Sequence, residues 1–191
     1  MSAGENELVR KAQGGDTEAF GRLVKQHSSM LFQVAFRLTG NEANAEDVVQ
    51  EAFIRAFRKL DRFDGRSAFG TWLYRITVNC SMDAMRKKQR NKERGDLEPV
   101  LEQRQPSTPE PGPQRLALSQ EISGHVASVL GAMSSMERTA FLLKHAEGHS
   151  LTEIADIMDV RVNAVKHAIF RAVKKLRAEL APLVRGNYET A

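Results

Sequence analysis

The chain has a single cysteine among its 191 residues, which excludes two kinds of site. Cys80 has no second thiol, so no disulfide can form within the chain. One cysteine also cannot supply a zinc site built on paired cysteines. Because Cys80 lies in an apolar helical pattern, we expect a buried structural thiol rather than a reactive one.

Long apolar runs are absent as well. No stretch approaches the roughly 18 consecutive apolar residues that a membrane-spanning helix needs. The N-terminal sequence MSAGENELVRKAQ has neither the apolar centre nor the cleavage site of a signal peptide. We therefore expect a cytoplasmic protein.

Signals for catalysis or metal binding are few. His145 and His149 lie four residues apart in HAEGH, but the glutamate is misplaced for the HExxH zinc motif and Gly148 interrupts the helix. No pair of nucleophile and base is recognisable among Ser, His, Asp and Cys80, and no glycine-rich phosphate loop is present. We expect no catalytic residue, no metal and no cofactor, and a protein that is not an enzyme.

Proline is scarce outside one segment, because five of the six prolines lie between residues 99 and 113. This segment is rich in Pro, Gln and Ser and poor in apolar residues, so it cannot bury enough surface to offset the entropy of ordering. We expect a flexible linker over residues 95–116. It separates a first domain, residues 1–94, from a second domain, residues 117–182, which is followed by a tail, residues 183–191.

Sustained strand alternation is missing, and the apolar residues of the first domain recur instead at helical spacing. They predict helices over about residues 17–38, 45–60 and 69–90, with Gly40 ending the first of them. The middle helix has apolar residues at positions i, i+3, i+4 and i+7, which is the stripe of a helix with one buried face.

The second domain has the pattern of further helices, at about residues 117–131, 135–145 and 150–159, before a long final helix. Ser150 and Glu153 form the sequence pattern of a capping box. Asn163 is the expected N-cap of the final helix. We therefore expect an all-α fold of two small helical domains, the second of them a helix-turn-helix.

The final helix is strongly basic: between Val160 and Ala178 there are six Lys or Arg and no acid. Two helices across a turn of about three residues, the second of them basic, are typical of a helix-turn-helix, which places its second helix in the major groove. The competing interpretation is a helical hairpin with a solvated charged face; the cap, the short turn and the one-sided charge argue against it. The candidate contacts to duplex DNA are Asn163, Lys166, His167, Phe170 and Arg171 near the helix N-terminus, and Lys174, Lys175 and Arg177 for phosphates.

Aromatic residues are also few, yet six of the twelve lie between Phe53 and Tyr74, close to the basic run RKKQRNKER at residues 86–94. Helical spacing accounts for three residues here as core: Phe53, Phe57 and Leu73. The other aromatic residues lie in or beside a loop, and for them two interpretations stay open. They are either core, or surfaces on which bases of single-stranded nucleic acid stack while the cations hold its backbone: Phe63, Phe69, Trp72 and Tyr74.

Four stretches follow one another along the chain: GDTEAFGRLV, RLTGNEANAEDVVQEAFIRAFRKLDRF, SAFGTWLYRITVN and SLTEIADIMDVRVNAVKHAIFRAVKKLR. Together they resemble the group IV, or extracytoplasmic function (ECF), sigma factors of bacterial RNA polymerase. The resemblance covers both domains, and AEDVVQEAFIRAFR and TWLYRITVN are its most specific motifs. It implies a protein that binds core polymerase and directs promoter-specific transcription initiation, in a stress or envelope response and under the control of an anti-sigma factor.

The resemblance also implies a division of labour between the domains. The first would bind the clamp helices of the largest polymerase subunit and melt the minus-ten promoter element. The second would contact the polymerase flap and read the minus-thirty-five element as duplex DNA. The polymerase-binding residues of the first domain would be Asp47, Gln50, Glu51, Arg55 and Arg58.

For the minus-ten element, the resemblance implies a loop that cradles a flipped base. This loop would consist of Phe63, Asp64, Gly65, Arg66, Ser67, Ala68 and Phe69. Asn79 would meet bases at the edge of the melted region, and Trp72 would be mostly core with one exposed edge. The phosphate contacts would be Arg75, Arg86, Lys87, Lys88 and Arg90.

The final helix departs from the Gly-Thr-Val-Lys-Ser-Arg start that is common in the family, because this chain has Asn163-Ala164-Val165-Lys166-His167-Ala168. The family's preferred duplex sequence is therefore not transferred. Two other classes compete: an ordinary helix-turn-helix regulator with an N-terminal sensor or dimerisation domain, and an interaction protein whose basic helices bind RNA or polymerase. Only a sigma factor would confer promoter-dependent initiation on core polymerase.

Overall fold

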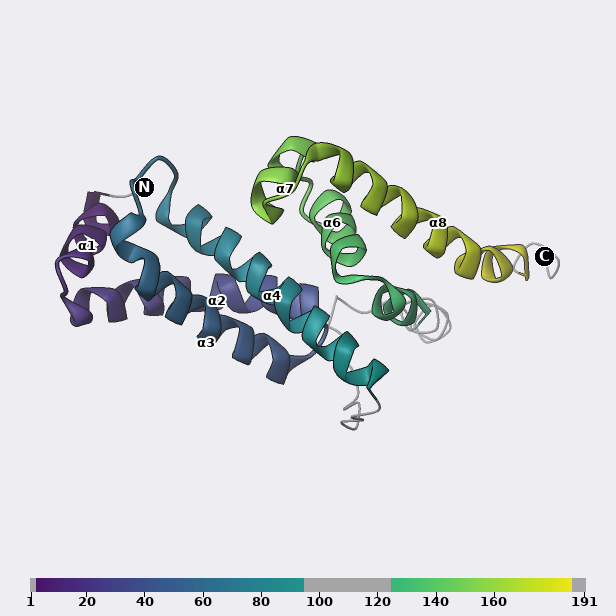
Figure 1. Cartoon of the computed structure of the whole chain (residues 1–191), viewed down its shortest axis with the longest axis horizontal. Coiled ribbons are helices and arrows are strands. Elements are labelled where there is room, and N and C mark those ends of the chain that lie inside the picture. The colour runs from purple at the N-terminus through teal and green to yellow at the C-terminus, as the bar shows by residue number, and fades with distance from the viewer. Residues whose placement is uncertain (1–2, 95–124, 187–191) are drawn as a thin grey trace, which may run out of the picture. The chain divides into compact units, whose positions relative to one another are not determined.

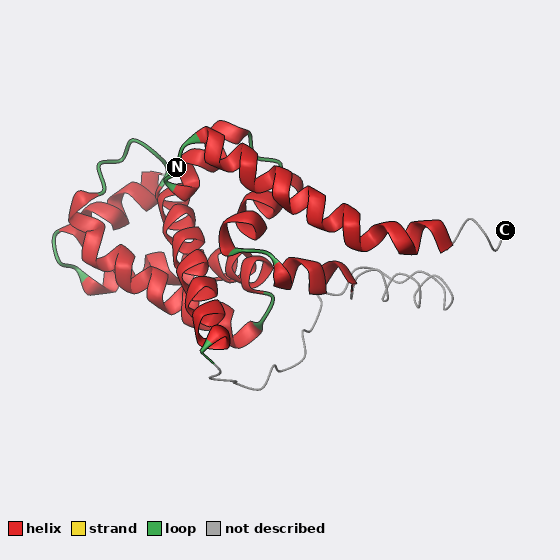
Figure 2. Cartoon of the chain, turned by 45° about the vertical axis from the view of Figure 1, so that its right-hand side comes forward, coloured by secondary structure: helices red, strands yellow, loops and turns green. Residues whose placement is uncertain are grey.

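The computed structural model describes residues 3–94 and 125–186, and within these ranges every regular element is a helix (Figures 1 and 2). This confirms the all-α prediction. The chain divides into two compact units, Met1–Val100 and Leu101–Ala191. The predicted linker at 95–116 and the first part of the predicted helix at 117–131 lie outside the described residues.

The first unit is a bundle of three long helices with a short helix across one end. The long helices are α2 (Thr17–Thr39), α3 (Glu42–Lys59) and α4 (Phe69–Glu93), and each of them packs against the other two. Helix α1 (Ala3–Gln13) packs on α2, and a single turn of 3₁₀ helix, η1 (Leu60–Arg62), follows α3. Gly40 ends α2 in the left-handed conformation, with φ of 70°, as the sequence predicted.

Two apolar clusters form the core of the bundle. One joins α1, α2, η1 and the start of α4, and at its centre are Leu23, Leu31, Phe69 and Leu73. The other joins the remaining length of the helices and includes Cys80, which is 3% exposed. Cys80 is thus buried as predicted, and burial raises the pKa of its thiol to about 11, which disfavours the reactive thiolate.

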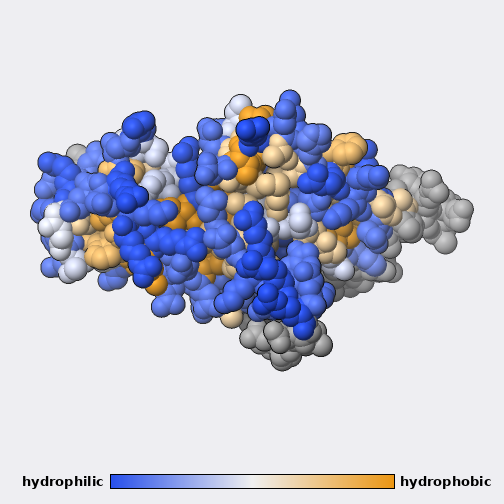
Figure 3. Space-filling model, viewed as in Figure 1, coloured by the Kyte–Doolittle hydropathy of each residue, from blue (hydrophilic) through white to orange (hydrophobic). Residues whose placement is uncertain are grey.

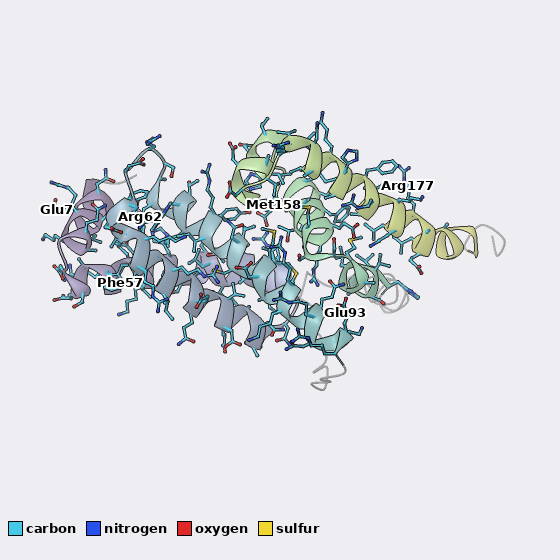
Figure 4. All side chains as sticks on the ribbon, viewed as in Figure 1. Glu7, Phe57, Arg62, Glu93, Met158 and Arg177 are labelled. Atoms are coloured by element: carbon cyan, nitrogen blue, oxygen red, sulfur yellow. The ribbon has the colours of Figure 1, made fainter. Side chains whose placement is uncertain are left out.

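The prediction that Phe57 belongs to the core is wrong. Its side chain is 49% exposed and rests edge-on against Phe20, with ring centroids 4.9 Å apart. The apolar stripe of α3 is wider than the surface that α2 and α4 cover, so its outer edge, with Ile54 and Phe57, faces solvent. Figure 4 labels Phe57. Phe53 is half-buried, and Leu73 is fully buried as predicted.

In the second unit, residues 125–132 are helical, and α6 (Ser135–His145) and α7 (Leu151–Met158) pack on the long α8 (Val162–Gly186). The Ser150–Glu153 capping box is present as predicted, and a second one, Ser134–Glu137, begins α6. Helix α7 ends at Asp159, whose φ of 53° turns the chain toward α8. Helix α8 continues to Gly186, beyond residue 183, where the tail was expected to begin.

The start of α8 differs from the prediction in two details. Asn163 is not the N-cap, because α8 begins at Val162 and the backbone N–H groups of Ala164 and Val165 both donate to the carbonyl of Arg161. Asn163 is an exposed residue of the first turn. Ala168, where an arginine is common in the family that the sequence resembles, is fully buried and belongs to the helical interface rather than to the outer surface.

Candidate nucleic-acid interface

The loop between η1 and α4, residues 63–68, presents a polar and mostly exposed surface. Gly65 has φ of 74°, a conformation that favours glycine, and lets the chain turn sharply. The Asp64 carboxylate accepts the backbone N–H of Arg66 at 3.1 Å and pairs with the Arg66 guanidinium at 2.6 Å. The backbone N–H of Arg66 lowers the pKa of Asp64, because the hydrogen bond favours the ionised carboxylate.

Three aromatic rings form the floor under this loop. The centroids of Phe63, Phe69 and Trp72 lie 5.2–5.6 Å from one another, in tilted or edge-on arrangements. Phe69 is fully buried, which corrects the expectation that it lines the base-binding loop: no base can stack on it without unpacking the core. Phe63 and Trp72 are half-buried, and their outer edges are the aromatic surface available beside the loop.

Two further contacts hold the loop in place, and sequence reasoning missed both. The side-chain amide of Gln13, the last residue of α1, donates to the carbonyls of Leu60 and Phe63, each at 2.9 Å. His27 packs against the ring of Phe69 and forms a hydrogen bond with Glu5 at 2.9 Å. Its ring also lies close to Gly70: a Cβ atom at that position would be only 3.2 Å from it. These pairs join residues that are 22–50 positions apart in sequence, so no local sequence pattern predicts them.

The exposed face of α4 continues from the loop as a stripe of polar and basic side chains. Spacings of four, seven and four residues put Arg75, Asn79, Arg86 and Arg90 on one side of the helix. Asn79 is half-buried and donates to the carbonyl of Arg75 at 3.0 Å. Lys87 and Lys88 are exposed on other sides of the C-terminal end of α4. Figure 4 labels Glu93 at this end, and Figure 3 shows its surface as strongly hydrophilic.

The solvent side of α3 combines charge with exposed apolar surface. Asp47, Gln50 and Arg58 are exposed there, next to Ile54 at 40% and Phe57 at 49% exposure. Arg55 is not available as a lone cation on this surface. Its guanidinium bonds to Asp83 on α4 at 2.9 Å and to Glu51 at 2.6 Å; these two carboxylates raise its pKa, and the three side chains tie α3 to α4.

Helix α8 presents its predicted DNA contacts on one exposed surface. Phe170 is 69% exposed, the most exposed large apolar side chain among the described residues. Residues 163, 167, 170 and 174 follow one another at spacings of four, three and four, so they share a face. The remaining predicted contacts are exposed too: Lys166, Arg171, Lys175 and Arg177.

Two of these cations are already paired with a buried acid that the sequence did not single out. Glu137, whose side chain is 6% exposed, accepts from Arg171 at 2.8 Å and from Lys175 at 2.7 Å. Burial by itself raises the pKa of Glu137, but the bonds from Lys175, Arg171 and the Ser134 N–H outweigh it and lower the pKa to about 2. In sequence, Glu137 shows only as a residue of the first turn of α6.

Neither a metal centre nor a membrane span is recognisable in the described ranges. No group of three or more His, Cys, Asp or Glu side chains lies close enough to hold a metal ion there. Of the helices over residues 3–94 and 125–186, none is long and apolar enough to cross a bilayer.

Comparison with known proteins gives the chain its family. The Sigma-70 region 2 model matches residues 23–91, and the Sigma-70, region 4 model matches residues 126–176. The ECF RNA polymerase sigma-E factor of Escherichia coli (strain K12) is 35% identical over 182 residues, which cover 93% of this chain and 95% of that protein. This chain belongs to the ECF sigma factors.

Other relatives of this sigma factor agree over nearly its whole length. The ECF RNA polymerase sigma factor SigW of Bacillus subtilis (strain 168) is 33% identical, covering 92% of this chain and 96% of its own. Among solved structures, CnrH in complex with the cytosolic domain of CnrY matches with a TM-score of 0.58 at 30% identity, covering 94% of this chain and 99% of that one. The sigma factor RpoE of Bartonella quintana, in complex with the anti-sigma factor NepR, matches with a TM-score of 0.57 at 26% identity, covering 85% and 96%.

The family assignment decides between the classes left open by the sequence. As an ECF sigma factor, the chain binds core RNA polymerase and promoter DNA and directs the initiation of transcription. Unit 1 matches region 2 and unit 2 matches region 4, and this match favours a sigma factor over an ordinary helix-turn-helix regulator. Helix α1, with Glu5 and Gln13, precedes the region 2 match.

Proposed function

We propose that this sigma factor holds one promoter in two forms, with the minus-ten element as a parted strand on unit 1 and the minus-thirty-five element as duplex on α8. The observation that carries the proposal is the contrast between the two surfaces. Unit 1 joins an exposed loop, two aromatic edges and a basic stripe, whereas α8 is a single exposed helix face. The first suits an extruded base and a single-stranded backbone, and the second fits the major groove.

The geometry of the loop and of α4 supports the proposed minus-ten contacts. Flipping a base out of its stack costs a few kcal/mol, and one stacked base returns roughly 1–3 kcal/mol. The polar loop, residues 63–68, would hold the extruded base against the edges of Phe63 and Trp72. Asn79 would contact a neighbouring base, and the phosphates would follow Arg75, Arg86, Lys87, Lys88 and Arg90.

The exposed face of α8 supports the proposed minus-thirty-five contacts. Asn163, Lys166, His167 and Phe170 lie closest to the helix N-terminus and would reach base edges, with the exposed ring of Phe170 against a thymine methyl. Arg171 shares this group. The phosphates would be held by Lys174, Lys175 and Arg177, which give affinity and register but little sequence information.

The polymerase surface is best placed on α3, against the clamp helices of the largest subunit. Exposed apolar residues ringed by charged ones are the usual make-up of a protein interface, and here Ile54 and Phe57 are ringed by Asp47, Gln50 and Arg58. Glu51 and Arg55 act mainly by fixing α3 on α4. Unit 2 would in turn contact the polymerase flap.

Regulation follows by analogy with the solved relatives. CnrH was solved with the cytosolic domain of CnrY and RpoE with the anti-sigma factor NepR. This sigma factor would likewise be held by an anti-sigma factor that covers its polymerase surfaces, and released in a stress or envelope response. It would act in the cytoplasm, and it would have no catalytic activity of its own.

Transcription reconstituted from core polymerase tests the proposal. Core enzyme with the purified chain should initiate from a subset of genomic fragments, and permanganate should detect unpaired thymines in their minus-ten regions. Core enzyme alone is the control. If no fragment is opened by the holoenzyme, or if opening does not depend on the chain, the proposal fails.

A further inference from the structure

Glu137 holds two of the cations that are proposed to contact the duplex. Its Oε1 accepts from Nε of Arg171 at 2.8 Å, and its Oε2 accepts from Nζ of Lys175 at 2.7 Å. These cations lie four residues apart on α8, whereas Glu137 lies in the first turn of α6, 34 and 38 positions earlier. One acid from a neighbouring helix therefore bridges two successive turns of α8.

The carboxylate itself is fixed. Its side chain is 6% exposed, and Oε2 also accepts the backbone N–H of Ser134 at 3.1 Å, which completes the capping box of α6. A buried charge is costly unless it is paired, so Glu137 cannot swing out to solvent without losing its three partners. Any movement at this point must come from Arg171 and Lys175.

The two cations remain accessible to a second partner. Their side chains are 52% and 46% exposed, and the pairing uses Nε of Arg171, which leaves the two terminal nitrogens outside that bond. Long basic side chains lose rotamer freedom when they bind phosphate. Here Glu137 has already restricted that freedom, and the three charges together sum to one positive charge rather than two.

We propose that Glu137 is a positioning residue for promoter selectivity: it presets Arg171 and Lys175 for the minus-thirty-five duplex and removes part of their attraction for unrelated DNA. The inference rests on the proposed function of α8. Selective binding gains from a preset geometry, whereas non-specific binding follows the number of phosphates neutralised. Both effects of Glu137 therefore increase the difference in affinity between the correct duplex and any other DNA.

The chain offers a matched control in Glu153. It occupies the same N3 position in the capping box of α7, where it accepts the Ser150 N–H at 2.8 Å, and no basic side chain of α8 bonds to it among the described residues. Glu153→Gln therefore removes a charge and weakens a cap in the same unit without releasing Arg171 or Lys175.

The test uses holoenzyme and promoter fragments selected from a random pool by the wild-type holoenzyme. Dissociation constants would be measured against salt for a fragment with the selected minus-thirty-five element and for one with that element scrambled. Glu137→Gln should bind the scrambled fragment more tightly, so the preference, which is the ratio of the two dissociation constants, should fall about fivefold. The slope of log Kd against log salt should steepen by about 0.9. Glu153→Gln should leave preference and slope unchanged.

Glu137→Asp separates position from charge. It keeps the carboxylate but draws it back by one methylene, so the preference should fall while the slope stays as in wild type. Thermal melting by circular dichroism checks that each variant is folded, and Glu137→Asp carries the test if Glu137→Gln does not fold. An unchanged or increased preference in the folded variants would overturn the inference. A wild-type holoenzyme that does not distinguish the two fragments would instead overturn the proposed function of α8.

Discussion

The two proposed nucleic-acid surfaces of this sigma factor are built in different ways. On α8, the proposed contacts lie on a single helix whose own periodicity puts them on one face. In unit 1, the loop at residues 63–68 owes its position to residues elsewhere: the buried Phe69, the amide of Gln13 and the ring of His27. A regular duplex can be read by a regular helix, whereas an extruded base needs an irregular pocket that the rest of the fold must hold in shape.

The largest difference between the two surfaces is expected from a matched pair of phenylalanines. Phe69→Ala removes a fully buried ring from the core below the loop and should cost about 3–5 kcal/mol of the free energy of unfolding. Phe170→Ala removes a ring that is 69% exposed and should change stability by less than about 0.5 kcal/mol. Urea unfolding of the full chain measures both.

Promoter recognition should be affected by Phe170→Ala even though its stability is not. Folded Phe170→Ala holoenzyme should lose preference for the minus-thirty-five element and still open a promoter whose minus-ten element is already mismatched. Equal stability losses in the two variants would show that Phe170 is a core residue and would remove the contrast between the surfaces.

A second effect concerns the acid sensitivity of the Glu137 bridge in unit 2. The folded-state pKa of Glu137, about 2, lies below the value of 4.5 for a free carboxyl. Its contribution, about 1–3 kcal/mol, is therefore fully present above pH 4.5 and is lost as the pH falls through 2. The difference in unfolding free energy between wild type and Glu137→Gln should shrink steadily from pH 5 to pH 2.5, and a constant difference would contradict this.

A third, smaller effect sharpens the role of α1 in positioning the loop. Gln13→Ala removes two hydrogen bonds to the carbonyls of Leu60 and Phe63 and should cost about 1 kcal/mol, because the amide is partly exposed. Promoter opening, followed by permanganate reactivity, should slow several-fold while duplex binding by α8 stays unchanged. Gln13→Glu, which cannot donate, should behave like Gln13→Ala. If it behaves like wild type, the hydrogen bonds do not position the loop.

The smallest effect is expected on α3, where two arginines have different roles. Arg55→Gln breaks the link to Glu51 and Asp83 and should lower stability by less than about 1 kcal/mol, since these groups are partly exposed. Arg58→Ala changes an exposed residue on the same helix and should weaken binding to core polymerase with no change in melting temperature. Native-gel titration and thermal melting compare the two, and a larger stability loss for Arg58→Ala would reverse the assignment.

The errors of sequence reasoning have a common physical cause. Periodicity predicted that α3 is amphipathic, but the width of the surface that α2 and α4 cover left Phe57 outside. The resemblance implied that Phe69 lines the base-binding loop, but the ring turns inward as the first residue of α4. Asn163 was a reasonable N-cap from residue type, yet α8 begins two positions earlier than that cap implies, because the Arg161 carbonyl accepts its first bonds.

By itself, the sequence determined the all-α fold, the Gly40 and Ser150 caps and the exposed contacts of α8, because each of these depends on neighbours within about one or two helical turns. Only the tertiary structure decided that Glu137 bridges Arg171 and Lys175, that Arg55 bonds to Asp83, and that Gln13 and His27 support the loop. These contacts join residues 28–50 positions apart or rings on different helices. Their partners are chosen by how the helices pack, and no local spacing encodes that choice.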